Sequence, residues 1–415
     1  MKKVSFFFIL SLFAAGCAHF SQKDMMRLQE GSWRGVLHRA DGVDVPFNFE
    51  VTDSANKSVM YIRNGAGRLL VDHLRYHGDT LFIRMPFFDS DFWAHFQNDG
   101  SLKGEWIKHY PDTNKLLKFT ATPNTLYRIT PTPAPARFNV SGRWRTTFIS
   151  GDKKDTEQAV GEFEQKGNLL TGTFLTTSGD YRYLQGVMDG DTLRLSTFDG
   201  SHVYLFTAQA VDSNTLVNGL YYSGFTGKNS WTAERDSSAH LPDAFSLTSF
   251  TPGDRLSFRF PDLKGDTVSI NDPRFKNKVV IVQIMGSWCP NCMDETRFMG
   301  PWYRENKDRG VEIIGLCYER STDFKTAVKN ILSFKDHFGV EYPLLVTGIT
   351  PSDPRLLEKT LPQLKNFIGF PTTIFINRKG EIAKVEAGFS GPGTGAHYQE
   401  FIRKFNQLVN QLLAE

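Results

Sequence analysis

Cysteine is scarce in this chain, with four among 415 residues. A small secreted scaffold held together by disulfide bonds carries a much denser set, so this class of protein is excluded. Structural zinc is disfavoured because it takes four ligands, often two cysteine pairs, and only one close pair is present, Cys289 and Cys292. Covalently attached c-type haem needs a histidine directly after the second cysteine, and Met293 stands there. We therefore expect neither a metal nor a cofactor.

Long apolar runs and blocks of like charge are also missing after the first 15 residues. A transmembrane helix takes about 20 apolar residues, and no later run reaches that length. The formal net charge is +3 and the charged residues are well mixed, so nothing indicates a nucleic-acid partner. The chain is too long for a single hydrophobic core, which predicts two or three domains.

The N-terminus carries an export signal, in which two lysines are followed by a short apolar run over residues 4–15. The run leads into Ala14-Ala15-Gly16-Cys17. Small residues before a cysteine resemble the bacterial lipoprotein cleavage box, although Ala14 stands where that box usually has a larger aliphatic residue. The resemblance implies that residues 1–16 are removed and that Cys17 becomes the lipidated first residue, and Ala18 in place of aspartate then favours the outer membrane. An ordinary signal peptide with an incidental cysteine is the alternative.

Residues 26–238 consist of short runs of alternating apolar and polar residues, separated by turn signals. Residues 45–51 form one such run, and residues 98–100 form an Asn-Asp-Gly turn. This alternation, with frequent Asp-Gly turns, predicts antiparallel meanders that close into barrels or sandwiches.

Several sequence pieces in this region occur twice. Trp33 and Trp144 stand in the same Gly-x-Trp-Arg context, and a Gly-Asp-Thr-Leu tetrapeptide follows each at nearly the same distance. We therefore predict a duplicated β domain, with one copy over residues 26–130 and the other over residues 137–238. The proline-rich segment between them is expected to be stiff and extended.

The β region is rich in aromatic residues, most densely over residues 87–96. Two interpretations fit this composition. One is a barrel that binds an apolar ligand or docks a substrate protein, and the other is ordinary core and cross-strand packing. The histidines of the region are scattered without metal-ligand spacing, and we assign no site to it.

The strongest chemical signal is Trp288-Cys289-Pro290-Asn291-Cys292. A strand-like run over residues 278–285 precedes it and helix formers follow, so a helix is predicted to begin at the motif. Cysteines at i and i+3 would then lie on one face, close enough to form a disulfide. The first cysteine would lie at the helix N-terminus, where the backbone dipoles favour the thiolate. A purely structural disulfide would add little stability across so short a loop, so redox exchange is favoured.

Residues 278–295 resemble the thioredoxin superfamily, most closely the membrane-anchored, periplasm-facing TlpA/ResA-like disulfide reductases. Gly369-Phe370-Pro371-Thr372 is similar to the cis-proline loop of that superfamily, which packs beside the two cysteines. The resemblance covers about residues 244–415 and implies an α/β thioredoxin-like domain. A strand over residues 245–250 and a hairpin are expected before its core, and a polar insertion with helical character over residues 351–366.

The resemblance also implies roles for single residues at the active site. Cys289 attacks the substrate disulfide as the thiolate, and Cys292 resolves the mixed disulfide. Trp288, Phe370 and Pro371 are expected to contact the substrate.

Glu295 and Gln283 are the residues near the motif that bear on proton transfer. Glu295 matches a glutamate beside the ResA-like active site and would relay the proton of Cys292; the alternative is an exposed acid in the first helical turn. Gln283 stands where thioredoxin has a buried aspartate, so that proton carrier is missing. Cys317 ends a predicted central strand, where buried and inert packing is favoured over a resolving role.

The sequence thus predicts a multidomain protein with a duplicated antiparallel β barrel or sandwich region and a C-terminal α/β thioredoxin-like domain. Residues 239–243 form a short linker, so residues 244–415 are expected to fold alone. The favoured function is a lipid-anchored thiol–disulfide oxidoreductase of the bacterial cell envelope. It would reduce disulfides of exported proteins and depend on an upstream thiol electron donor. The alternatives are a peroxiredoxin-like peroxidase and a lipid-anchored binding protein whose β domains carry the function.

Overall fold

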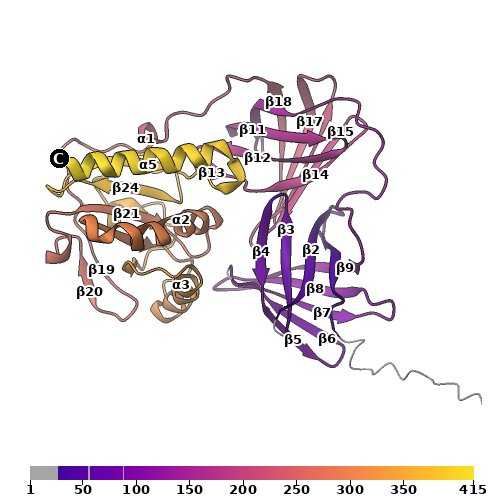
Figure 1. Ribbon diagram of the computed structural model, residues 1–415, viewed down its shortest axis with the longest axis horizontal. Helices are drawn as coiled ribbons and strands as arrows, with labels where there is room; N and C mark the ends of the chain where they lie inside the picture. The colour runs from indigo at the N-terminus through magenta and orange to yellow at the C-terminus, as the bar shows by residue number, and fades with distance from the viewer. Residues whose placement is uncertain (1–26, 55–56, 87) are drawn as a thin grey trace, which may run out of the picture.

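The computed structural model describes residues 27–54, 57–86 and 88–415 (Figure 1). The export signal and Cys17 lie outside the described residues. In Figure 1 an α/β domain lies on the left and two β domains lie on the right, one above the other. Within the described ranges, none of the helices combines the length and the apolar character that a bilayer-spanning segment needs.

The first β domain is a 9-stranded antiparallel sheet. Its strands are β1 (Gly31–His38), β2 (Asp44–Ser54), β3 (Lys57–Asn64), β4 (Gly67–Val71), β5 (His73–His77), β6 (Thr80–Arg84), β7 (Ser90–Phe96), β8 (Leu102–His109) and β9 (Asn114–Pro123). Their order in the sheet is β4-β3-β2-β1-β9-β8-β7-β6-β5, so the first and last strands are neighbours. The predicted alternation over residues 45–51 is confirmed, because all four apolar side chains of that run are buried.

The second β domain is also a 9-stranded antiparallel sheet. Its strands are β10 (Gly142–Ile149), β11 (Thr156–Lys166), β12 (Leu169–Thr176), β13 (Gly179–Asp180), β14 (Leu184–Asp189), β15 (Thr192–Phe198), β16 (Val203–Ala210), β17 (Thr215–Ser223) and β18 (Gly227–Arg235). Strand β12 pairs with both β14 and β11, and this closes the sheet into a barrel. Both domains pair their first strand with their last, but the duplication itself stays a prediction.

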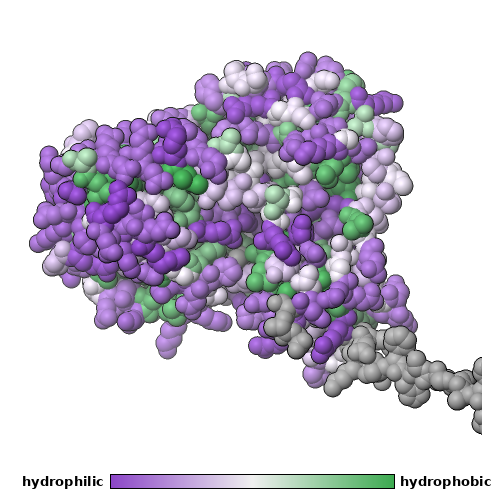
Figure 2. Space-filling view, viewed as in Figure 1, coloured by the Kyte–Doolittle hydropathy of each residue, from purple (hydrophilic) through white to green (hydrophobic). Residues whose placement is uncertain are grey.

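The two β domains share hydrophobic core. The ring of Phe198 from the second domain lies 4.6 Å from the ring of Phe47 in the first. The buried guanidinium of Arg39 donates hydrogen bonds to the carbonyl oxygens of Ser223 and Gly224 at 3.0 and 2.6 Å. Most of the aromatic residues of the region are therefore core residues, as the packing interpretation predicts. The visible face of the molecule in Figure 2 is mostly hydrophilic, with small apolar patches.

The α/β domain is built on a 5-stranded sheet of order β23-β22-β21-β24-β25. The sheet strands are β21 (Val279–Met285), β22 (Val311–Cys317), β23 (Leu344–Val346), β24 (Thr372–Ile376) and β25 (Ile382–Ala387). The other elements are α1 (Ala244–Leu247), β19 (Arg259–Pro261), β20 (Thr267–Ser269), α2 (Pro290–Asn306), α3 (Phe324–Phe338), α4 (Leu356–Thr360), α5 (Ala396–Ala414) and three 3-10 turns, η1 (Pro273–Phe275), η2 (Lys307–Arg309) and η3 (Pro392–Thr394). Strands β21 and β22 are buried along their whole length because hydrophobic clusters cover both faces of the sheet.

One detail of this domain differs from expectation. The strand predicted over residues 245–250 is wrong: the chain forms the short helix α1 there. The side chain of Asp243 accepts a hydrogen bond from the amide of Phe245 and caps this helix. The helical character expected of the insertion over residues 351–366 is confirmed and is confined to the five-residue helix α4.

The connection between the second β domain and the α/β domain is packed against both. Ala239 is buried beside Val160 and Leu175, and its carbonyl oxygen accepts a hydrogen bond from Arg143 at 3.3 Å. Further along, His397 Nε2 at the start of α5 lies 2.8 Å from a carboxylate oxygen of Glu162. The expected linker therefore runs along an interface between domains.

Candidate redox site

The Trp-Cys-Pro-Asn-Cys motif lies between the carboxyl end of β21 and the start of α2, as predicted. Cys289 is the N-cap of α2, and its sulfur accepts a hydrogen bond from the amide of Cys292 at 3.2 Å. Pro290 occupies the first helical position, where its missing N–H costs nothing. Cys289 and Cys292 form a disulfide with Cα atoms 5.2 Å apart. The helix N-terminus therefore points its free amides at the first cysteine, an arrangement that stabilises a thiolate there after reduction.

The loop before β24 lies directly beside the disulfide. The peptide bond between Phe370 and Pro371 is cis, as the resemblance implies. The sulfur of Cys289 lies 3.8 Å from the carbonyl oxygen of Phe370. The Trp288 and Phe370 rings meet edge to face at 5.4 Å. The structure thus brings together all five residues that the sequence assigned to the cysteine pair and its substrate contacts.

Glu295 lies one helical turn after Cys292 and is buried, with 1% of its surface exposed. Its carboxylate accepts hydrogen bonds from Gln283 Nε2 and from the Thr373 hydroxyl, both at 2.7 Å. Burial raises the pKa of Glu295 to about 7, although both hydrogen bonds favour the charged form. The alternative of an exposed first-turn acid is therefore wrong. This carboxyl group takes up and releases a proton near neutral pH.

Gln283 links Glu295 to a buried polar group beneath the motif. Its amide donates to the Thr296 hydroxyl at 3.1 Å, and its carbonyl oxygen accepts from the Tyr342 hydroxyl at 3.3 Å. Gln283 stands at the position of thioredoxin's buried aspartate. It is not a proton carrier, and its hydrogen bond holds Glu295 in place. A neutral amide satisfies the carboxyl group without adding a second buried charge.

Cys317 is buried at the end of β22 and is not paired with another cysteine. Burial raises the pKa of its thiol well above the ordinary value, and the charge of Glu319 raises it further. A thiol that does not ionise is a poor nucleophile. The packing interpretation of Cys317 is therefore the one that the structure supports.

The β domains approach the disulfide closely, which the sequence did not predict. Phe88, from the loop between β6 and β7, belongs to the same buried apolar cluster as Cys289 and Cys292. Cys289 is 4% exposed and Cys292 is fully buried. The aromatic stretch over residues 87–96 was the only sequence signal for this contact, and nothing in it indicated a partner in the α/β domain.

The turn over residues 177–180 of the second β domain touches the motif from another side. A Cβ atom placed on Gly179 would lie 2.0 Å from Asn291 Nδ2, so the turn packs closely against the middle of the motif and a larger residue would have to move the Asn291 side chain. A Cβ on Gly369, at the cis-proline loop, would lie 3.6 Å from the side chain of Ser178. This turn therefore occupies the space between the motif and the cis-proline loop.

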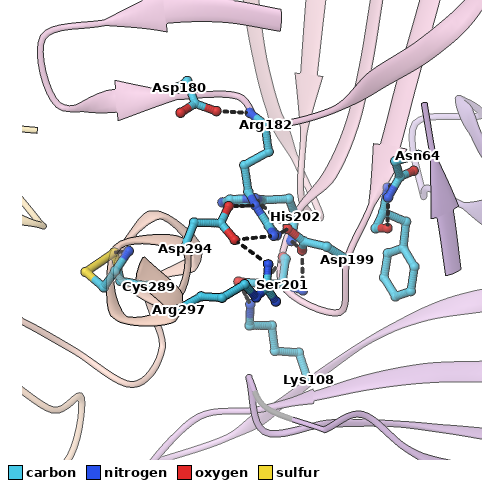
Figure 3. A network of polar contacts seen from close by, with 12 residues as sticks. Asn64, Lys108, Asp180, Arg182, Asp199, Ser201, His202, Cys289, Asp294 and Arg297 are labelled. Carbon is cyan, nitrogen blue, oxygen red and sulfur yellow. Dashed lines mark hydrogen bonds and ion pairs between the residues drawn. A yellow bond between two sulfur atoms is a disulfide. The ribbon is translucent and has the colours of Figure 1, made fainter. Parts of the chain in front are cut away.

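A buried ionic network joins the second β domain to α2 (Figure 3). The Arg182 guanidinium donates to Asp294 Oδ2 at 2.8 Å and to Asp199 Oδ2 at 2.7 Å. Burial alone would raise the pKa of Asp199, but the charges of His202 and Arg182 outweigh it and hold that pKa well below its usual range. Burial alone would lower the pKa of Arg182, but the charges of Asp294 and Asp199 outweigh it and raise that pKa. The network fixes the β domain against the first turns of the helix that carries both cysteines.

Asp180 forms a second polar link at the same interface. Its carboxylate accepts a hydrogen bond from the amide of Gly391 at 2.7 Å. Burial raises the pKa of Asp180 to about 6 in spite of that bond. Among the described residues, no group of three or more histidine, cysteine, aspartate or glutamate side chains is arranged to hold a metal ion.

Comparison with known proteins gives matches to the α/β domain. Residues 247–400 match the family model described as Redoxin. The thiol–disulfide oxidoreductase ResA of Halalkalibacterium halodurans is 27% identical over 155 residues, which cover 37% of this chain and 74% of that protein. The Bacillus subtilis protein of the same name is 30% identical over 135 residues, or 32% of this chain and 66% of that protein. A solved thioredoxin-family thiol:disulfide interchange protein from Chlorobium tepidum TLS is 20% identical over 40% of this chain and 99% of that chain, with a TM-score of 0.30, which carries no argument of its own.

The sequence matches show what class of protein the C-terminal part belongs to. The α/β domain is a thioredoxin-like domain that matches the Redoxin family model and is similar to thiol–disulfide oxidoreductases, as the resemblance implied. The protein is an oxidoreductase through this domain. The family match begins at residue 247 and does not include the β domains.

Proposed function

We propose that this protein is a thiol–disulfide oxidoreductase of the cell envelope that reduces disulfides of exported proteins through Cys289 and Cys292. One observation carries the proposal. The two cysteines form a disulfide at the N-terminus of a helix, beside the cis-proline loop, with a buried glutamate one turn further on. Each part of this arrangement serves one step of disulfide exchange.

The first step is attack on the substrate. The Cys289 thiolate attacks one sulfur of the substrate disulfide, and a mixed disulfide forms while the second substrate sulfur leaves as a thiolate. Free amides at the start of α2 stabilise the attacking thiolate. Trp288, Phe370 and Pro371 hold the substrate chain next to the sulfur.

The second step releases the substrate. Cys292 loses its proton to Glu295, whose pKa of about 7 suits it to accept and return a proton near neutral pH. The Cys292 thiolate then attacks the sulfur of Cys289, and the substrate leaves with both of its sulfurs reduced. The Cys289–Cys292 disulfide that remains is reduced by an upstream thiol donor, which returns the enzyme to its starting state.

Localisation forms part of the same proposal. Residues 1–16 direct export, and the lipidated Cys17 anchors the mature protein to the membrane, with the outer membrane favoured. The lipoprotein-like Ala-Ala-Gly-Cys sequence supports this anchoring. Substitution Cys17→Ser should release the protein from the membrane fraction or leave it unprocessed.

Trapping of mixed disulfides tests the chemistry. Cys292→Ser keeps the attacking thiol and lacks the resolving one, so it should accumulate mixed disulfides with envelope proteins that dissolve in reductant. Cys289→Ser should trap almost none, and Cys317→Ser, which removes the buried third thiol, serves as the matched control and should behave as wild type. The reverse pattern, with Cys292 as the partner-bound thiol, would contradict the assigned roles. A protein that keeps its function in cells without Cys289 would instead be a binding protein.

A further inference from the structure

A cavity of about 420 Å³ lies where the first β domain meets the α/β domain. Trp288 and Ser287 line it on the side of the redox motif, and Phe88 and Tyr110 line it on the side of the β domain. The cavity therefore borders the residue that directly precedes Cys289. No step of the mechanism above uses it.

Arg320 is the chemically distinctive residue of this cavity. It follows β22, and its guanidinium lies 4.9 Å from the ring of Trp288 and 5.4 Å from the ring of Tyr110. The planar group is thus held between an aromatic residue of the motif and one of the β domain. Within residues 27–54, 57–86 and 88–415, it has no hydrogen-bond acceptor or carboxylate partner. Its N–H groups are therefore free to bind an acceptor in the cavity.

The acidic residues near Arg320 are already used elsewhere. Glu319 accepts hydrogen bonds from the amide and the hydroxyl of Ser287 at 2.8 and 2.7 Å. Across the cavity, Asp89 and Asp91 pair with Arg84 at 2.5 and 3.0 Å. The positive charge of Arg320 is consequently not neutralised by an ion pair within the described protein.

A second cation lies near Arg320. The amino group of Lys108 donates to the carbonyl oxygen and the hydroxyl of Ser201 at 3.2 and 2.8 Å (Figure 3). Burial lowers the pKa of Lys108 to about 7, and the charge of Arg320 lowers it further. A bound anion would relieve this repulsion between neighbouring cations.

Access to Cys289 differs between the sides of the motif. The turn over residues 177–180 fills the side of Asn291 and Gly369. Phe88 lies on the Trp288 side of the motif. Phe88 and Asp89 both have positive φ, at 76° and 45°. Two successive residues other than glycine with positive φ are uncommon, and such a backbone conformation is strained. The cavity therefore lies on the side of the motif that the turn over residues 177–180 does not fill.

We propose that the cavity is the subsite for a carboxylate carried by the sulfur compound that exchanges with Cys289, and that Arg320 binds this carboxylate through its fork of N–H donors. The inference rests on the proposed function and names the class of partner. That partner is a disulfide or thiol with a carboxylate a few bonds from its sulfur. It is either a small molecule or an acidic residue next to a cysteine in an extended peptide. In the exchange, the Cys289 thiolate bonds to one sulfur of the bound disulfide, and the other sulfur leaves as a thiolate.

Two chromogenic aromatic disulfides test the inference on the reduced full-length protein. One, 5,5′-dithiobis(2-nitrobenzoate), carries carboxylates, and the other, 4,4′-dithiodipyridine, is neutral. Arg320→Gln should lower the rate constant for the anionic probe about tenfold relative to the neutral one, because a charge-assisted bidentate contact is lost. Arg403→Gln, on the exposed surface of α5, is the matched control and should leave the ratio unchanged. A ratio that Arg320→Gln also leaves unchanged, or equal slowing with both probes, would overturn the subsite.

A pair of short peptide disulfides with glutamate or glutamine beside the cysteine distinguishes the two sources of the carboxylate. Preference for glutamate that disappears in Arg320→Gln assigns the cavity to an acidic peptide. If only the chromogenic pair shows a preference for the anionic disulfide, the cavity is assigned to a small molecule. If neither the chromogenic pair nor the peptide pair shows a preference for the carboxylate, the inference is overturned.

A binding measurement separates the subsite from the chemistry. Cys289→Ser cannot exchange, so saturable binding of the 3-carboxy-4-nitrothiophenolate anion to this variant, weakened about tenfold by adding Arg320→Gln, would support the subsite alone. If this binding is seen while the reduced wild-type protein reacts with neither disulfide, the proposed function fails and the subsite stands. Absence of binding together with normal exchange overturns the subsite and leaves the function intact.

Discussion

The α/β domain and the β domains contribute different things to the same site. The α/β domain contributes the sulfur chemistry: the capped cysteine, the cis-proline loop and the buried Glu295. The β domains contribute residues that pack around the motif, namely Phe88 from the first domain and the turn over residues 177–180 from the second. A redox motif that is chemically complete within one domain is thus covered by two others.

The two regions also stabilise their buried charges differently. Within the α/β domain, Glu295 lies among neutral partners, and burial raises its pKa to about 7. At the interface, Arg182 lies between two carboxylates that keep it charged. The first arrangement suits a group that exchanges a proton, and the second suits a group that holds two domains together.

Removal of both β domains is the strongest way to break this comparison. Residues 244–415 contain the whole sheet and the helices that cover it, so this fragment should be soluble and folded. Because the walls around Cys289 are gone, it should reduce insulin faster than the full chain. Far-UV circular dichroism and an insulin-reduction assay check both points. An unfolded fragment would show that the β domains form part of its core.

Loss of the interface cation should give the next largest effect. Arg182→Leu leaves Asp294 and Asp199 buried without their shared partner, which should cost about 3–5 kcal/mol of interface stability. Arg403→Leu removes an exposed ion pair on α5 and should cost less than about 1 kcal/mol. Urea unfolding measures the difference, and alkylation of the reduced cysteines should become faster in Arg182→Leu. Equal costs for the two variants would mean that the network does not hold the domains together.

A methyl group at the turn tests the contact with the motif itself. Gly179→Ala places a Cβ against Asn291 and should destabilise the interface by about 1–3 kcal/mol through overpacking. Gly31 also has a large positive φ, 111°, but nothing lies within 4 Å of its missing Cβ, so Gly31→Ala measures backbone strain alone. The excess cost of Gly179→Ala over this control reports the contact. No excess would show that the turn does not press on the motif.

The smallest expected effect on stability concerns Glu295 and depends on pH. Its pKa is about 7 in the folded protein and 4.5 ordinarily, so the folded state binds this proton more tightly than the unfolded state. The contribution is fully present below pH 4.5 and is lost as the pH rises through 7. Glu295→Gln cannot ionise, so its free energy of unfolding relative to wild type should rise by about 1–2 kcal/mol between about pH 5 and about pH 8.

Exchange kinetics show whether this carboxyl group also moves a proton. Glu295→Gln should slow resolution of the mixed disulfide, most clearly near neutral pH, while initial attack by Cys289 keeps its rate. A pH-independent difference in stability together with unchanged resolution would make Glu295 a structural residue only.

Local features of the site could be predicted from the sequence because they depend on neighbours along the chain. The start of α2 follows from a strand, a turn and Pro290 within a dozen residues. Strand β21 follows from a continuous apolar run that only a strand covered on both faces can bury. The helix α1 was missed because its cap at Asp243 outweighs the strand preference of four residues.

Other features depended on segments far apart in the sequence. Arg182 and Asp294 are 112 positions apart and look like ordinary surface charges when read alone. Arg320 gains its place between Trp288 and Tyr110 only when the first β domain packs against the α/β domain. Burial of these groups could not be predicted, because it depends on which surface covers them.

The sequence by itself determined the chemistry: the spacing places two cysteines at a helix start, and the resemblance to thioredoxin-like proteins implies the cis-proline loop and the nearby glutamate. Only the tertiary structure decided the pKa of Glu295 and the burial of Cys289. Glu295 has a pKa near neutrality because strands β21 and β24 enclose it. Cys289 is covered because Phe88 of the first β domain and the turn over residues 177–180 of the second pack near the motif. The physical reason is that spacing is a property of the chain, whereas desolvation depends on everything that folds around a group.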